Sequence, residues 1–79
     1  MSPVRAVPIR DETIRLGQLL KLANVVGDGA MARMVIENRE VTVDGEFVMR
    51  RGTQIRPGQL VEYAGEQFTP SRESSPSLR

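Results

Sequence analysis

The chain has 79 residues, of which 11 are Lys or Arg and 10 are Asp or Glu, so its formal net charge is +1. It contains neither cysteine nor histidine, which excludes disulfides, thiolate zinc sites and nucleophilic catalysis by a Ser-His or Cys-His pair. This length suits one domain, and a charge so near zero gives only weak support for a nucleic-acid partner.

The same composition bears on location. No apolar run approaches the roughly 18 residues that a membrane-spanning helix needs, and residues 1–12 lack the apolar segment of a secretory signal. A soluble cytoplasmic protein is therefore expected, monomeric and without a cofactor or metal.

The two ends of the chain differ in composition from its middle. Residues 1–12 contain Pro3 and Pro8 and are expected to form a flexible arm, in which residues 7–10 fit either an edge strand or disorder. Residues 66–79 are rich in Ser and Pro and predict a disordered tail. The ordered domain is thus expected over residues 13–65.

Two helices are predicted first. Thr13 is a candidate N-cap for a helix over residues 14–26, whose buried face carries leucine and alanine at i, i+3, i+4 and i+7. Asp28 is the cap candidate for a helix over residues 29–38, because its carboxylate can accept the free N–H groups there. Asn38 ends that helix and tolerates a left-handed conformation. The expected core positions of the second helix are Ala30, Met31, Met34 and Val35.

The apolar period then changes to two, which predicts strands. Residues 41–43 and 46–49 flank Asp44-Gly45, a strong signal for a tight hairpin. Pro57-Gly58 predicts a turn, between a strand near Ile55 and a last strand over residues 60–63. The fold class is therefore α+β, with two short N-terminal helices packed on a small antiparallel sheet. Phe47 and Leu60 are also assigned to the core.

Four stretches, taken in order and at their spacing, resemble the S4 RNA-binding domain family, or alpha-L RNA-binding motif, and in particular its small free-standing bacterial members. They comprise Arg15-Leu16 with Leu19-Leu20-Lys21, Ala32-Arg33 with Val35-Ile36, Val41-Thr42-Val43-Asp44-Gly45, and Arg56-Pro57-Gly58-Gln59-Leu60-Val61. The resemblance covers about 50 residues. It implies a non-catalytic domain whose two helices and hairpin present one surface to structured RNA, with ribosomal or transfer RNA as partner and ribosomal particles as a further one.

Several positions depart from the family pattern. Gly17 stands where many members carry Asp, Asp44 replaces the commoner Asn, and Gln59 replaces the usual Asp. Thr53 and Gln54 stand where related proteins often have lysine, which thins the basic face.

The candidate RNA-binding residues are the cations of the two helices, the hairpin strand and the turns, because Lys and Arg track phosphates and Arg matches their oxygens bidentately. They are Arg15, Lys21, Arg33, Arg39, Arg50, Arg51 and Arg56. For each the alternative is an ordinary solvated charge, and for Arg33 it is a surface pair with Glu37 at i, i+4. Arg39 is a weaker candidate, because the acidic residues beside it partly cancel its charge.

Two other sequence features are assigned no catalytic or binding role. Asp11-Glu12 lacks supporting metal ligands and fits a solvated pair. Gly27-Asp28-Gly29 lacks the Gly-Lys-Ser/Thr of a phosphate loop and fits a helix entry. Three functions are considered: an RNA-binding module, a protein-interaction module on the same fold, and an enzyme. No cluster of residues in the sequence indicates an enzyme.

Overall fold

The computed structural model describes residues 4–72 of the chain. Within them, seven short strands and two helices follow one another. In chain order they are β1 (Arg5–Ile9), β2 (Ile14–Arg15), α1 (Leu16–Leu22), α2 (Gly29–Glu37), β3 (Val41–Val43), β4 (Glu46–Phe47), β5 (Gln54–Ile55), β6 (Val61–Tyr63) and β7 (Glu66–Arg72).

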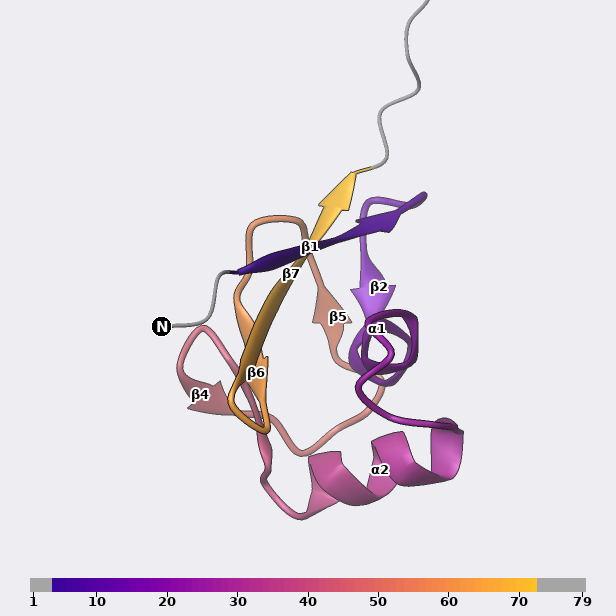
Figure 1. The fold of residues 1–79 in the computed structure, drawn as a ribbon, viewed down its shortest axis with the longest axis vertical. Helices are drawn as coiled ribbons and strands as arrows, with labels where there is room; N and C mark the ends of the chain where they lie inside the picture. Colours follow the sequence, from indigo (N-terminus) through magenta and orange to yellow (C-terminus); the bar gives the residue numbers. More distant parts are fainter. Residues whose placement is uncertain (1–3, 73–79) are drawn as a thin grey trace, which may run out of the picture.

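The strands form two sheets. The larger has the order β1-β7-β6-β3-β4, and β2 and β5 make a separate antiparallel pair. Both helices lie to the right of β6 and β7 in Figure 1. One cluster of buried side chains joins them to the sheet, including Leu16, Leu19 and Leu20 from α1 and Phe68 from β7. All four of these side chains have no exposed surface, so α1 and β7 are central to the core.

The α+β class with two helices is confirmed, but two details of the prediction are wrong. The helices are not the first elements, because β1 and β2 precede them. The main sheet is mixed rather than antiparallel, because β1 runs parallel to β7 while the other neighbours are antiparallel. The parallel pair joins the two ends of the described chain, an arrangement that no local pattern specifies.

Both termini contribute more order than the sequence predicts. The edge strand expected near residues 7–10 exists as β1, and the predicted disorder from residue 66 is wrong as far as Arg72, because β7 occupies this segment. Phe68 and Pro70 face inward there, while Gln67 and Thr69 are half-buried. Pro70 is tolerated because the pairing of β7 with β6 ends at Phe68, beyond which only β1 lies alongside. The remainder of the predicted tail, residues 73–79, lies outside the described residues.

The start of α1 also differs from the prediction. Thr13 is not its N-cap, because the helix begins at Leu16 and the Thr13 hydroxyl donates to Gln54 Oε1 at 2.6 Å. The first helical N–H groups are satisfied by a distant loop instead: Leu16 N donates to Thr53 O at 2.9 Å and Gly17 N to Arg51 O at 3.0 Å. The loop between β4 and β5 is therefore fastened to the first turn of α1.

The second helix begins as predicted, but the left-handed residue after it lies one position later than predicted. Asp28 is its N-cap, since Oδ1 accepts from Met31 N at 2.8 Å. The left-handed residue after the helix is Arg39, with φ of 60°, whereas Asn38 has φ of −83°. The chain thus places a bulky residue in a conformation that Gly or Asn adopts at lower cost.

Four side chains assigned to the core, those of Ala30, Met31, Met34 and Phe47, are exposed instead. Met31 is 40%, Met34 58% and Phe47 64% exposed, and Leu60 is half-buried. In α2 the buried positions are Ala32, Val35 and Ile36, so the face that packs on the core is rotated from the one the methionines suggested. The exposed apolar side chains are therefore available for contacts outside the domain.

The Asp44-Gly45 hairpin is confirmed, with φ of 53° and 87° at the two positions. The Asp44 carboxylate also ties this turn to the Pro57-Gly58 turn: Oδ1 accepts from Leu60 N at 2.9 Å and Oδ2 from Gln59 Nε2 at 3.2 Å. Two departures from the family pattern, Asp44 and Gln59, therefore meet in one contact. The hydrogen bond from Leu60, followed by that from Gln59, lowers the pKa of Asp44 below its ordinary value of 3.8.

This carboxylate makes stability depend on pH in a definite direction. Because the pKa of Asp44 is lower in the folded chain, its contribution is present above pH 3.8 and is lost as the pH falls through the folded value. We expect Asp44→Asn, which loses the acceptor facing Gln59, to lower the urea midpoint at neutral pH, and the difference from the native protein to shrink in acid. Glu46→Gln, in the same hairpin, is the control and should keep the native midpoint at neutral pH. A pH-independent loss in Asp44→Asn would contradict this account.

A second tight hairpin, between β6 and β7, was not predicted. Ala64 and Gly65 both have positive φ, 55° and 81°, which is the conformation that favours Asn-Gly. Alanine in the left-handed region costs about 1 kcal/mol. Because alanine is not a typical turn residue, the sequence did not indicate a hairpin here.

Replacing Ala64 by asparagine is expected to stabilise the fold by about 0.5–1 kcal/mol, because asparagine adopts this conformation more readily and the position is exposed. Urea unfolding monitored by circular dichroism measures the change. Ala6→Asn, at an exposed position of the extended strand β1, is the control and should give no gain. An unchanged or lower midpoint for Ala64→Asn would show that the turn is not strained.

Candidate nucleic-acid interface

Two adjoining hollows bring most of the predicted cations together, and they share Arg51 and Gly52. The first lies between α1, the start of α2 and the β4–β5 loop, and is lined by Arg15, Gly17, Gln18, Lys21, Gly29, Ala32, Arg51 and Gly52. The second lies between α2 and the same loop, and is lined by Arg33, Glu37, Met49, Arg50, Arg51, Gly52 and Thr53. The β4–β5 loop is thus the ridge between two basic hollows.

The backbone positions Arg51 over α1. Gly17 N donates to Arg51 O, and a Cβ added to Gly17 would lie 3.5 Å from the Arg51 Cβ, so the loop packs directly on the helix backbone. Lys21 follows Gly17 at i+4 and therefore shares its helical face. Arg15 sits just before the helix, where β2 pairs with Gln54 of β5. Three cations from separate segments consequently surround one hollow.

The first hollow also contains the start of α2. Gly29 is the first residue of this helix, and the N-terminus of a helix carries a partial positive charge. Asp28 uses its carboxylate to cap the N–H of Met31, while the other N–H groups of the first turn have no intrahelical acceptor. The negative charge of the Asp28 carboxylate offsets the partial positive charge of this helix end, so the positive potential of the hollow comes from its cations. The sequence indicated a helix entry here, whose N-terminus can still receive a phosphate.

In the second hollow, Arg33 forms the surface pair that had been the alternative interpretation. Its Nε lies 2.9 Å from Glu37 Oε2, and both side chains are more than half exposed. Such a pair contributes only a few tenths of a kcal/mol. The guanidinium has five N–H donors, of which this contact uses the one on Nε. A pair this weak can exchange Glu37 for a phosphate without a large cost to folding.

Two of the seven predicted cations lie elsewhere. Arg39 is the left-handed residue after α2, and Arg56 begins the Pro57-Gly58 turn, where its backbone N–H donates to Gln59 Oε1 at 2.8 Å. Neither lines the two basic hollows. The cations that the structure gathers are Arg15, Lys21, Arg33, Arg50 and Arg51.

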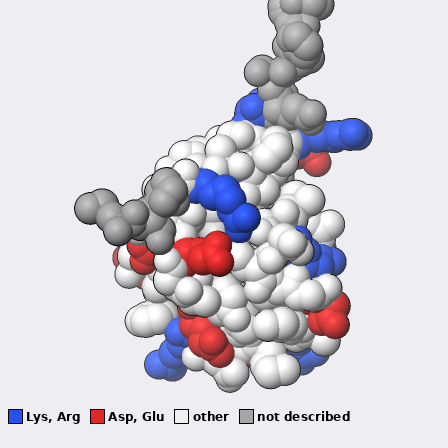
Figure 2. All heavy atoms as spheres, in the orientation of Figure 1, with Lys and Arg blue, Asp and Glu red and all other residues white. Residues whose placement is uncertain are grey.

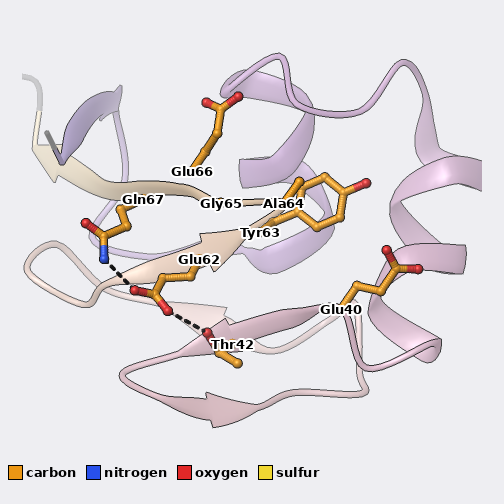
Figure 3. Close-up of a pocket in the computed structure, with 8 residues that line it drawn as sticks. All are labelled: Glu40, Thr42, Glu62, Tyr63, Ala64, Gly65, Glu66 and Gln67. Carbon is orange, nitrogen blue, oxygen red and sulfur yellow. Dashed lines mark hydrogen bonds between the residues drawn. The ribbon is translucent and has the colours of Figure 1, made fainter. Parts of the chain in front are cut away.

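A third hollow, on the outer face of the sheet, is acidic. Figure 3 shows Glu62 at its centre, accepting hydrogen bonds from Thr42 on β3 and Gln67 on β7. Glu40 and Glu66 also line it, as does Tyr63. It shares no residue with the basic hollows. The charges of each sign are therefore grouped locally although they nearly cancel over the whole chain.

The grouping is local rather than global. On the face that Figure 2 displays, basic and acidic side chains alternate over a mostly uncharged surface, and no large area of one sign appears. Because the net charge of the whole chain is only +1, any attraction for a polyanion depends on the local arrangement of cations in the hollows. The cations of each hollow line the same small space, whereas interactions between charges separated by more than the Debye length, about 10 Å at 0.1 M salt, are largely screened.

Within residues 4–72, no group of three or more Asp or Glu side chains is arranged to hold a metal ion. No helix of that part of the chain is long and apolar enough to cross a bilayer.

Comparison with known proteins agrees with this architecture. Residues 7–69 match the model of the S4 domain family, and the match includes most of β1 and the first half of β7. The chain is also similar to the probable ribosome maturation protein RlbA of Bacillus subtilis, with 42% identity over 59 residues, which are 75% of this chain and 83% of that protein. The match of the family model over residues 7–69 and the 42% identity to a relative covered over 83% of its length lead to one conclusion: this chain belongs to the S4 domain family.

Proposed function

We propose that this protein is a non-catalytic RNA-binding protein that acts on ribosomal particles, with ribosomal RNA as its partner. The observation that carries the proposal is the meeting of Arg15, Lys21 and Arg51 around one hollow that also contains the start of α2. The similarity to a probable ribosome maturation protein supports ribosomal RNA over transfer RNA as the target. Action on ribosomal particles would place the protein in the cytoplasm.

The physical basis is phosphate recognition. Each phosphate neutralised by a cation releases counterions, so binding is favourable at low salt and weakens steeply as salt is added. Arg51 borders both hollows, which lets it bridge two neighbouring phosphates of one strand. Structured RNA is recognised largely through shape, phosphates and 2′-hydroxyls, a mode that requires no dense basic field.

Two other functions have less support. An enzyme would have to use groups such as Asp, Glu, Lys or Ser for catalysis, because the chain has no histidine or cysteine. A protein-interaction module is favoured by one observation, the exposure of Met31 and Met34 on α2. Those methionines lie outside the two basic hollows, so this function does not explain the gathered cations.

The test is a fluorescence-anisotropy titration with ribosomal RNA and with duplex DNA, each at low and at physiological salt. We expect salt-sensitive binding to RNA, weaker binding to DNA, and a large loss of affinity in the double variant Arg50→Glu/Arg51→Glu. Circular dichroism of this variant confirms that it is folded. If the native protein binds no RNA at low salt, the proposal fails and Met31 and Met34 become the surface to examine.

A further inference from the structure

The most exposed aromatic ring in the protein is that of Phe47, two residues before Met49, which lines the second basic hollow. The chain has three aromatic residues: Phe68 is fully buried, Tyr63 is half-buried and Phe47 is 64% exposed. An aromatic side chain usually buries a large apolar area. Phe47 does not contribute to the core, so the fold itself gives no reason for a phenyl ring here.

The strand geometry connects Phe47 to the basic hollows through Met49. Phe47 lies in β4, at the edge of the sheet, and Val48 extends the ladder by donating its N–H to Val41 O at 3.3 Å. Val48 packs against the core. Because side chains alternate along an extended chain, Phe47 and Met49 project away from that core. Met49 is 52% exposed and lines the second hollow with Arg33 and Arg50.

The chemistry on the two sides of Phe47 indicates how a ligand would approach. Thr42 is the partner of Phe47 on β3, so the two side chains lie on the same face of the sheet, where Thr42 lines the acidic hollow with Glu62; the acidic side chains there repel phosphates. On the other side, the chain continues through Met49 to Arg50 and Arg51. A polyanion held by these arginines therefore ends its contacts at an uncharged, apolar ring and thioether.

We propose that Phe47 and Met49 form a stacking platform for an unpaired nucleotide of the bound RNA, next to the phosphates held by Arg50 and Arg51. A nucleobase has two apolar faces and stacks on aromatic rings, and it is accessible when extruded from a helix. The platform would direct the protein to RNA helices interrupted by a bulge or loop. This inference rests on the proposed function.

The test uses two short RNA hairpins with the same stem, one fully paired and one with a single bulged 2-aminopurine. We expect the native protein to bind the bulged hairpin about tenfold more tightly and to quench its fluorescence, a gain in the range measured for base–aromatic stacking. Phe47→Leu, which keeps an apolar side chain but removes the ring, should lose both the preference and the quenching. Phe47→Tyr should retain them. Because Phe47 is exposed, both variants should keep the native urea midpoint.

The outcomes separate this inference from the function on which it rests. If Arg51→Glu weakens binding to both hairpins, while native protein and Phe47→Leu bind them equally, RNA binding stands and the platform is refuted. If native protein binds neither hairpin nor ribosomal RNA, the proposed function fails first. If Phe47→Leu binds RNA as the native protein does but no longer associates with ribosomal particles, the ring contacts a protein, which also overturns the inference.

Discussion

Phe68→Ala is expected to destabilise the fold by about 3–5 kcal/mol, the usual cost of truncating a fully buried phenylalanine. Phe68 has no exposed surface and lies between two strands, opposite Val61 on β6 and Arg5 on β1. A domain of this size has a net stability of only about 3–5 kcal/mol from its core. The variant should therefore be largely unfolded at room temperature, even though the residue lies in a segment whose composition suggests a tail.

Far-ultraviolet circular dichroism and urea titration measure this effect. The matched control is Thr69→Ala, because Thr69 is the next residue of the same strand but is only half-buried and its hydroxyl makes one long hydrogen bond of 3.5 Å. We expect the control to stay folded with a small change in midpoint. A cooperative unfolding transition for Phe68→Ala close to that of the native protein would show that β7 is dispensable.

The failure to predict β7 from the sequence has a physical explanation. Ser, Pro and charged residues are typical of disordered segments. Glu66–Arg72 has this composition because only Phe68 and Pro70 of the strand face inward. The strand exists because β6 and β1 flank it, and parallel pairing with β1 is a contact between distant segments that no local pattern encodes. The start of α1 was missed for the same reason, since its first N–H groups bind the distant carbonyls of Arg51 and Thr53.

Features with a local cause were predicted correctly. Asp28 caps α2 through its own first turn, and Asp44-Gly45 turns the hairpin because both residues accept positive φ. The burial of Leu16, Leu19 and Leu20 followed from helical spacing. The buried face of α2 was misjudged because Met31 and Met34 share the i, i+3 spacing of a core face, although the residues that pack are smaller or β-branched.

The same distinction applies to the candidate site. Sequence reasoning selected cations by family position, and five of its seven choices line the two basic hollows. It could not find the shared position of Arg51 between the hollows, because that depends on the loop's bonds to α1. Phe47 was assigned to the core by its hydrophobicity alone, and the edge position of β4 decides otherwise.

Arg51→Glu is expected to lower the affinity for ribosomal RNA by about tenfold or more, the largest effect of any single charge reversal on this surface. Arg51 borders both hollows, so the new carboxylate faces phosphates in either one. The dependence of log affinity on log salt concentration should also become shallower by about one unit, because at least one phosphate contact and its counterion release are lost. The fold should persist, since the bond from Gly17 uses the Arg51 backbone.

The matched control for this variant is Arg56→Glu. It makes the same change in net charge at an exposed arginine that lines neither hollow. With a native net charge of only +1, either reversal leaves the protein with a formal charge of −1. If net charge governed binding, the two variants would lose affinity equally. A large loss for Arg51→Glu and a small one for Arg56→Glu would instead mean that a nearly neutral protein binds RNA through the local grouping of its cations, held in place by the contact between a loop and a helix.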